Sequence, residues 1–314
     1  MNRRQAIWLV VLAGCAACGA PEGRELAGTE QPIIGGAADA GHPAVCVVLA
    51  GDYVCSATLI GRRVVLTAAH CFDGVDAGEA RVYFGPEVFG PDSLRGGLVS
   101  RAAEEVFVHP GWEPEGEQAH DLALVRLGKR APADLAPIPP LGSDAGITRE
   151  DVGAPMLLLG YGLTASGDPA SSGRRMAVQA PLRWLCTYPG GCKEPVDEMW
   201  ADLPENSMCF DYTSGGTCFG DSGGPALVVR QGIEYVAGVG SVGGQECAHY
   251  HCSAMVDPAE DFIQGIAAAD GTTCSTADQC LSDHCDDGLC APDPGGGGCT
   301  TGPGSGSCFL SLLL

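Results

Sequence analysis

The chain has 314 residues, with 17 Lys plus Arg against 39 Asp plus Glu, which gives a formal net charge of -22 at pH 7. That charge would repel nucleic-acid phosphates and anionic membrane surfaces, and it argues against nucleic-acid binding. The 47 glycines and 22 prolines favour many turns and short strands over long helices, and the 17 cysteines, which lack the paired spacing of zinc sites, predict disulfides in an exported protein.

The N-terminus has the features of an export signal. A basic "MNRR" precedes a short apolar run that is too short to anchor the chain across a bilayer. The run ends in "LAGC", which resembles the lipobox of bacterial lipoproteins, whose cysteine becomes the lipid-bearing first residue. We predict a signal peptide over residues 1–14, a lipid anchor at Cys15, a tether or propeptide over residues 15–32, and an outer-membrane or secreted protein. Ordinary signal cleavage near Ala20 is the alternative.

Two sets of strand-like segments follow, and both are rich in Val and Leu with Gly, Pro and Asp between the segments. The first set occupies residues 44–50, 53–61, 62–71, 80–85, 104–112 and 121–128. The second set occupies residues 154–162, 175–184, 225–230, 233–244 and 252–258. A Pro-rich segment over residues 135–146 crosses between them. Two β-rich halves of similar size predict an all-β fold of two barrels.

The C-terminal part contains a helix, a Cys-rich segment and a tail. Residues 258–269 begin with acidic residues and place apolar residues on one face, which predicts a short helix. Residues 270–292 hold four cysteines and too few apolar residues for a core, which predicts a small module with two disulfides of undecided connectivity. Residues 293–314 form a Gly-rich tail that is either the start of an anchoring segment or an unstructured end.

Three segments carry the residue types that amide hydrolysis needs, namely a nucleophile, a base, a group that orients the base and donors for an oxyanion. His70 stands in "VLTAAHC". Asp121 enters an apolar strand in "HDLALVRL", where a carboxylate without a partner would be costly. Ser222 lies in "CFGDSGGPAL", among glycines that let backbone N–H groups approach a substrate oxygen.

Together, and in this order, the three motifs resemble the chymotrypsin-type serine peptidase family over residues 33–269. The resemblance implies two packed six-stranded antiparallel β-barrels with a short C-terminal helix. It also implies a serine endopeptidase that cleaves protein or peptide substrates through an acyl-enzyme, without a cofactor or metal. Ser222 would be the nucleophile, His70 the general base and then acid, and Asp121 the residue that holds the imidazole. The N–H groups of Gly220 and Ser222 would form the oxyanion hole.

The resemblance also implies three disulfides. The first would fix the loop that bears His70, and the second would staple the pocket wall. The pairs are Cys55–Cys71, Cys218–Cys247 and Cys186–Cys209, with Cys192 as the alternative partner of Cys209. No partner is assigned to Cys46, Cys192 or Cys252, so this domain holds an odd number of cysteines.

The stretch "EQPIIGGAAD" resembles the site at which family members are activated. Cleavage there frees an α-amine that folds inward and pairs with the Asp before the nucleophile, which here would be Ile33 and Asp221. A half-assembled buried charge pair is costly, so the uncut chain would be an inactive zymogen. Pro32 stands where a basic residue is usual, so we expect a separate activating protease. A cut at this point would also release residues 15–32 together with any lipid on Cys15.

The resemblance places a primary specificity pocket beside Ser222. We assign to it Gly216 as the floor, Thr217, Ser241 and Gly243. Val242 stands where the family has an aromatic residue. A trypsin-like floor would carry Asp, so we predict an uncharged pocket for small or medium apolar side chains and no preference for Arg or Lys.

Three alternatives remain open at this level. His251, in a short His-rich loop near the pocket, would make the enzyme specific for acidic residues if it accepts their carboxylates. A catalytically silent peptidase-like binding protein is favoured by Pro32 and disfavoured by the intact triad. Esterase activity would use the same triad. The acidic run at Asp73, Asp76 and Glu79 lacks a ligand pattern, so no metal is predicted.

Overall fold

The structure is a computed structural model. It describes residues 33, 35–89, 94–116, 118–165, 168, 171–196, 199–213, 215–244, 247–268 and 274–291. The predicted signal peptide, the lipidation site at Cys15, the tether and the tail over residues 293–314 lie outside the described residues. Within those ranges, no helix has the length and apolar character needed to cross a membrane.

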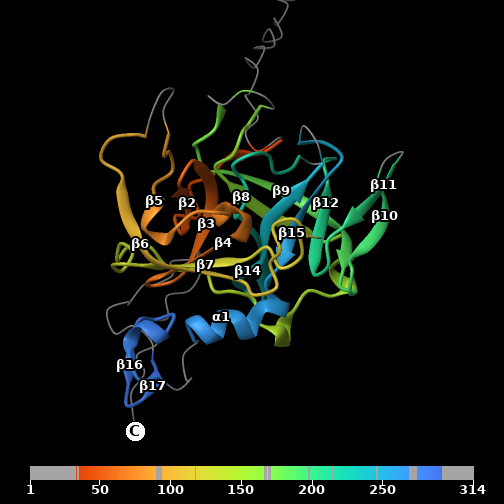
Figure 1. Cartoon of the computed structure of the whole chain (residues 1–314). Coiled ribbons are helices and arrows are strands. Elements are labelled where there is room, and N and C mark those ends of the chain that lie inside the picture. Colours follow the sequence, from red (N-terminus) through yellow and green to blue (C-terminus); the bar gives the residue numbers. More distant parts are fainter. Residues whose placement is uncertain are drawn as a thin grey trace, which may run out of the picture. The chain divides into compact units, whose positions relative to one another are not determined.

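The first half of the chain forms a closed antiparallel barrel with the strand order β2-β3-β4-β7-β6-β5 (Figure 1). Its strands are β2 (Val45–Ala50), β3 (Tyr53–Gly61), β4 (Val64–Thr67), β5 (Ala80–Phe84), β6 (Val99–Val108) and β7 (Ala123–Leu127). All four residues of β4 are buried, because Val and Leu there face either the barrel interior or the second barrel. The barrel thus supplies a rigid support for the loops at its strand ends.

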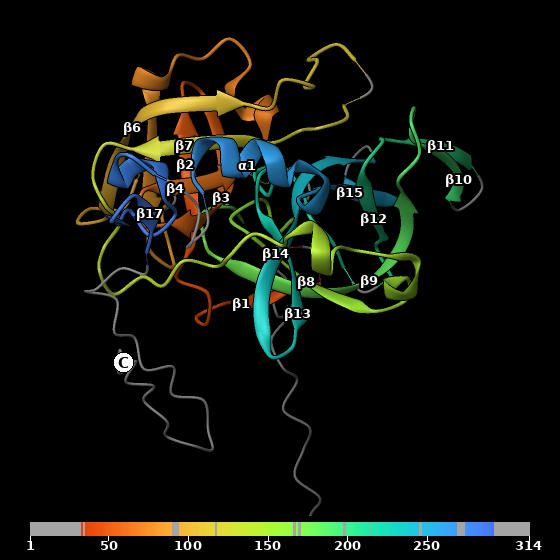
Figure 2. The ribbon, with the colours of Figure 1, turned by 90° about the horizontal axis from the view of Figure 1, so that it is seen from below.

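The second half forms another six-stranded ring, in the order β9-β12-β15-β14-β13-β8, which the pairing of β8 with β9 closes. The strands are β8 (Pro155–Gly160), β9 (Met176–Cys186), β12 (Ser207–Asp211), β13 (Pro225–Arg230), β14 (Ile233–Gly243) and β15 (Tyr250–Met255), and the short β1 (Ala37–Ala38) joins β9. The predicted fold of two six-stranded antiparallel barrels is confirmed, and Figures 1 and 2 show the barrels side by side.

Three strands between β9 and β13 have no counterpart among the predicted segments. β12 is only five residues long, and its "SMCFD" carries polar residues at both ends although four of its five residues are buried. β10 (Cys192–Val196) and β11 (Met199–Leu203) form a separate two-stranded ribbon (Figure 1). Charged residues and Pro195 in β10 hide it from a pattern search, because they interrupt the apolar alternation of a sheet strand.

One core cluster contains residues of both barrels, and its Tyr161 links them directly. The Tyr161 side chain is buried after β8, and its hydroxyl contacts the carbonyl oxygens of Val45 and Gly85 at 2.9 Å and 2.6 Å. Arg175, which is 3% exposed, lies 3.2 Å from the same hydroxyl and pairs with Asp39 at 2.8 Å. In the part of the chain that the structure describes, the connections include the 3-10 helices Ala69–Phe72, Ala77–Glu79, Ser143–Ala145, Arg149–Asp151, Asp257–Ala259 and Ala277–Gln279.

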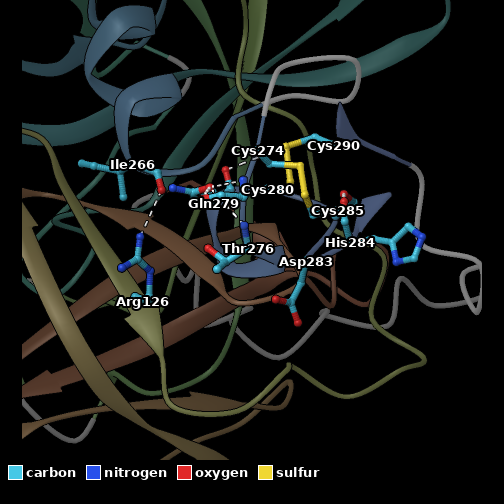
Figure 3. The surroundings of a disulfide bond; sticks show 12 residues. Arg126, Ile266, Cys274, Thr276, Gln279, Cys280, Asp283, His284, Cys285 and Cys290 are labelled. Carbon is cyan, nitrogen blue, oxygen red and sulfur yellow. Dashed lines mark hydrogen bonds between the residues drawn. A yellow bond between two sulfur atoms is a disulfide. The ribbon is translucent and has the colours of Figure 1, made fainter. Parts of the chain in front are cut away.

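The predicted C-terminal helix is α1 (Glu260–Ile266), with two acidic residues in its first turn. Its last carbonyl, on Ile266, accepts a hydrogen bond from the Arg126 guanidinium at 3.0 Å (Figure 3). A cation at the C-terminal end of a helix interacts favourably with the helix dipole. Arg126 belongs to β7, so this contact joins the helix to the first barrel.

The Cys-rich segment folds into a small module with the hairpin β16 (Cys285–Asp286) and β17 (Leu289–Cys290). Its connectivity, which the sequence left open, is Cys274–Cys285 and Cys280–Cys290 (Figure 3). Disulfides replace most of the apolar core that so short a segment lacks.

This module packs on the first barrel. The backbone N–H of Arg62 donates to the carbonyl of Leu281 at 2.7 Å, and a Cβ at Gly61 would lie 2.7 Å from the same oxygen. Arg130 donates to both the carboxylate and the carbonyl of the buried Asp283. The module is therefore docked against the end of β3, where only glycine allows so close an approach of the two backbones.

The predicted Cys186–Cys209 disulfide is wrong. The structure pairs Cys186 with Cys192 and Cys209 with Cys252. Strand register is the reason: β12 and β15 place Cys209 directly opposite Cys252, whereas across β9 Cys209 faces Trp184. The Cys55–Cys71 and Cys218–Cys247 disulfides are present. Among the described cysteines, Cys46 is the free thiol, and it is buried in β2.

Candidate active site

His70 and Asp121 lie at the same edge of the first barrel, where β4 ends and its antiparallel neighbour β7 begins. His70 lies in the 3-10 turn that follows β4, and the Cys55–Cys71 disulfide ties this turn to β3. Asp121 stands just before β7 and is fully buried. One Asp121 oxygen accepts from the His70 backbone N–H at 2.9 Å, and the other lies 2.7 Å from His70 Nδ1. The carboxylate therefore determines which imidazole nitrogen carries the proton.

The hydroxyl of Ser241 also donates to Asp121, at 2.5 Å. With two oxygens accepting three hydrogen bonds, the buried carboxylate has the partners that a charge needs away from water. Burial alone would lower the pKa of His70, but the hydrogen bond and the charge of Asp121, together with the charge of Asp73, outweigh it and raise that pKa above its ordinary value of 6.5. The imidazole is thereby prepared to accept a proton.

Asp73 and Trp112 are neighbours of His70 that the motifs did not reveal. The Trp112 indole N–H donates to the Asp73 carboxylate at 3.0 Å, and the indole ring lies 6.5 Å from the His70 ring. Asp73 belongs to the acidic run for which the sequence predicts no metal. Nothing local marks this pair, because 39 residues separate the partners along the chain.

Ser222 comes from the loop that precedes β13 in the second barrel. Gly220 and Gly223 have φ angles of +94° and +83°, which other residues rarely adopt. A Cβ at Gly223 would lie 2.1 Å from Thr67 Oγ1 of the first barrel, so the loop passes very close to β4. The "GDSGG" motif is thus required both for backbone conformation and for contact between the barrels.

His70, Ser222, Gly220 and Ser241 line one cleft, with a volume of about 1010 Å³. The remainder of its lining is largely apolar or aromatic and includes Tyr53, Val54, Phe89, Leu94, Trp112, Leu163 and Phe219. Several of these side chains are well exposed, and Phe219 is 67% exposed. The cleft offers an extended apolar surface beside the polar groups, which suits a polypeptide segment better than a small ligand.

A second cavity of about 290 Å³ adjoins Ser222. Its lining includes the predicted pocket residues Thr217, Ser241 and Gly243, together with Tyr212, Cys218, Phe219, Gly240, Val242, Gly244 and Cys247. Gly216, the predicted floor, is not among the lining residues that the structure describes. A Cβ there would lie 2.5 Å from the Tyr212 ring, so Gly216 packs against Tyr212, which lines the cavity.

His251 contacts Tyr212 and is not among the described residues that line the cavity. Its ring stacks on Phe210 and meets the edge of Tyr212, both at 5.1 Å between ring centroids. Neither ring nitrogen has a hydrogen-bond partner among the described residues. Burial lowers the pKa of His251 to about 3, against the opposing charge of Asp211. The imidazole is therefore neutral at any pH above about 4.

The two residues of the predicted activation pair are both buried. Ile33 packs in the core cluster of the second barrel. Asp221 accepts from the backbone N–H groups of Gly162 and Cys218, each at 2.8 Å. No ion pair to Asp221 occurs within the described part of the uncut chain. Burial therefore raises the pKa of Asp221 to about 7, although both backbone hydrogen bonds act in the other direction.

The comparisons with known proteins agree with this geometry. The trypsin family model matches residues 33–265. Coagulation factor XII of Sus scrofa is 30% identical over 228 residues, which are 68% of this chain and 35% of that protein. Snake venom serine protease HS112 of Bothrops jararaca is 28% identical over 248 residues, or 74% of this chain and 86% of its own.

Trypsin of Saccharopolyspora erythraea is 30% identical over 184 residues, which are 57% of this chain and 72% of that protein. The matched part thus spans about a third of the length of the porcine relative. The family model covers both barrels, including the segments of His70, Asp121 and Ser222. The chain therefore belongs to the trypsin family.

Proposed function

We propose that the protein is a serine endopeptidase. The observation that carries this proposal is the convergence of His70, Ser222 and Gly220 on one cleft, with Asp121 hydrogen-bonded behind His70. In this proposal, Ser222 Oγ attacks the substrate carbonyl while His70 takes its proton. His70 then protonates the leaving amine, and water hydrolyses the acyl-enzyme in a second step of the same kind.

Asp121 has an electrostatic role in this mechanism. It holds the Nδ1 proton of His70 and stabilises the imidazolium that forms when Ser222 loses its proton. The N–H groups of Gly220 and Ser222 donate to the oxyanion of the tetrahedral intermediate. The apolar cleft next to these groups supports a protein or peptide substrate over a small ester, because it can hold several residues on either side of the cleaved bond.

Active-site labelling tests this function. A chain that begins at Ile33 is expected to react covalently with a fluorophosphonate probe, and Ser222→Ala is expected to abolish the labelling because the attacking oxygen is lost. The measurement is probe fluorescence on the intact protein, with mass spectrometry to locate the adduct. Heat-denatured protein is the control for non-specific reaction. A catalytically silent binding protein would stay unlabelled, and that result would contradict the proposal.

For specificity, we propose a preference for small or medium apolar side chains. The 290 Å³ pocket is lined by Tyr212, Thr217, Val242 and backbone groups, and no charged side chain is among its described lining residues. Burial raises the pKa of Tyr212 and the charge of Asp221 adds to this effect, so the phenol stays neutral. A neutral pocket gains nothing from a charged substrate side chain and would leave it desolvated.

A peptide library scan checks this preference. We expect cleavage after small and medium apolar residues, with no gain for Asp or Glu between pH 5 and 8, because His251 carries no charge in that range. The matched control is His251→Gln, which should keep the wild-type profile. A preference for acidic residues that strengthens at low pH and is lost in His251→Gln would establish the alternative of acidic specificity. Cleavage confined to Arg and Lys would contradict both versions.

A zymogen form is also part of the proposal. The buried Asp221 lacks a cationic partner within the described uncut chain, and a freed Ile33 amine would supply one. Pro32 points to a separate activating protease. We also propose export, as an outer-membrane lipoprotein anchored at Cys15 or as a secreted protein, on the basis of the N-terminal sequence and the six disulfides among the described residues.

A further inference from the structure

A buried serine of the first barrel, Ser56, bonds to the loop that carries Ser222. Ser56 follows Cys55 in β3 and is fully buried. Its backbone N–H donates to the carbonyl of Ser222 at 2.8 Å, and its hydroxyl donates to the carbonyl of Gly220, also at 2.8 Å. The same hydroxyl accepts from the backbone N–H of Tyr161 at 2.9 Å. One side chain thus joins the first barrel, the end of β8 and the Ser222 loop.

The direction of these hydrogen bonds is unambiguous. The Tyr161 N–H group can only donate, so the Ser56 oxygen must accept there, and the single hydroxyl proton is left for the Gly220 carbonyl, which can only accept. Within the described residues, the Ser56 hydroxyl is the one hydrogen-bond donor to that carbonyl. Loss of the hydroxyl would therefore leave a buried N–H and a partly buried C=O without partners.

Gly220 is a residue whose conformation has to be held from outside. Its φ of +94° lies in a region where glycine moves freely, and a Cβ would lie 2.9 Å from Gly162 Cα, so no larger residue can replace it. The peptide before Gly220 is held by the Leu163 N–H, which donates to the Phe219 carbonyl at 2.8 Å. The peptide after it is held at both groups: the hydroxyl of Ser56 donates to the Gly220 carbonyl, and the Asp221 N–H donates to the Cys218 carbonyl at 3.0 Å.

In a trans peptide the N–H group points away from the preceding carbonyl. Because the Phe219 carbonyl is engaged by Leu163, the Gly220 N–H is turned the opposite way, and Gly220 lines the cleft with His70 and Ser222. The Gly220 N–H belongs to the peptide before Gly220, and its orientation also depends on the peptide after Gly220, because glycine rotates freely between the two. Only the peptide after Gly220 is held by a side chain, that of Ser56, which lies outside the loop and can be replaced without changing the loop.

We propose that Ser56 is a positioning residue that keeps the Gly220 N–H aimed at the developing oxyanion. The inference rests on the proposed peptidase function and names a group outside the triad and outside the loop. A correctly oriented donor stabilises the transition state more than the bound substrate, because the oxygen becomes negatively charged only in the transition state. Ser56 therefore acts on kcat and leaves substrate binding nearly unchanged.

The test compares Ser56→Ala with the wild type, both starting at Ile33. We expect kcat to fall about tenfold, which corresponds to ~1.4 kcal/mol, while KM stays within about twofold. The affinity for a peptide trifluoromethyl ketone, which places a tetrahedral oxyanion in the site, should fall by the same factor. Fluorophosphonate labelling should still go to completion, because Ser222, His70 and Asp121 are intact. Rates are normalised to the labelled fraction so that misfolded protein does not count.

Thr58→Val is the matched control. Thr58 lies two residues further along β3, is also buried, and has a hydroxyl without a partner among the described residues. The replacement removes a hydroxyl from the same strand without touching the Ser222 loop, so kcat and ketone affinity should not change. Ser56→Gly is a second variant for the case in which Ser56→Ala does not fold, and the same fall in kcat is expected.

Two results would overturn the inference. Wild-type kcat and ketone affinity in a folded Ser56 variant would show that Gly220 is held without the hydroxyl. An equal loss in Thr58→Val would show that β3 packing, and not the hydrogen bond, is responsible. Failure of the proposed function looks different: the wild type itself would not label with the fluorophosphonate, and the positioning role would fall with it.

Discussion

Replacing Asp121 by Asn is expected to lower kcat by about 10⁴-fold. The Asn amide would offer a donor where His70 Nδ1–H now meets a carboxylate oxygen at 2.7 Å, so the imidazole would adopt the tautomer that cannot take the proton of Ser222. The folded structure should persist, because the Asn oxygen can keep the bond from the His70 N–H, and the Ser241 hydroxyl can turn to accept from the Asn amide. The measurement is kcat and KM on a chromogenic peptide.

The pH profile gives this prediction a second readout. In the wild type the raised pKa of His70 places the acid limb of kcat/KM above pH 6.5, since only the neutral imidazole acts as the base. Without the Asp121 charge, burial of His70 dominates and the limb should move to lower pH.

Asp73→Asn is the matched control for Asp121→Asn. It removes a charge near His70 while keeping an oxygen for the Trp112 indole N–H, and less than a tenfold loss is expected. An Asp121→Asn variant within tenfold of the wild type would contradict the assigned role.

Replacing Asp221 by Asn is expected to keep a chain cut before Ile33 nearly inactive. The proposed pair between the Ile33 amine and the Asp221 carboxylate would be broken, and removing one partner of a buried pair costs about 3–5 kcal/mol, or roughly 10²–10⁴-fold in the active population. The carboxylate now accepts from Gly162 and Cys218, at the base of the loop that carries Gly220 and Ser222. The measurement is the kcat of cut and uncut forms of both proteins, and wild-type kcat in cut Asp221→Asn would refute the activation mechanism.

Stability of the uncut chain provides an independent check on Asp221. Its folded pKa of about 7 exceeds its ordinary value of 3.8, so the folded state binds the extra proton between these values. This group therefore contributes stability that is fully present below about pH 4 and is lost as the pH rises through 7, by up to ~1.4 kcal/mol per pH unit. From pH 5 to pH 7, the unfolding free energy of the uncut wild type should therefore fall relative to that of uncut Asp221→Asn. In the cut wild type, the freed amine should make this fall smaller.

The sequence alone was sufficient to predict the fold class and the three residues of the proposed triad. His70, Asp121 and Ser222 stand in short motifs whose chemistry is local: a carboxylate inside an apolar strand and a serine among glycines need an explanation wherever they occur. The two sets of Val-rich and Leu-rich segments predicted two barrels for the same reason, since alternation and turn residues are properties of the chain alone.

Tertiary structure decided what depends on register and on contacts between distant segments. The Cys209–Cys252 disulfide follows from the pairing of β12 with β15. No periodic pattern in the sequence marks β12, which is only five residues long. Two site residues have no sequence motif around them: Tyr212, which lines the pocket, and Ser56, which donates to the Gly220 carbonyl. Ser56 and Gly220 are 164 residues apart, and their hydrogen bond exists only because the two barrels pack face to face. Local sequence patterns do not predict contacts between distant segments, because the free energy that favours these contacts comes from burying the surfaces of both segments together.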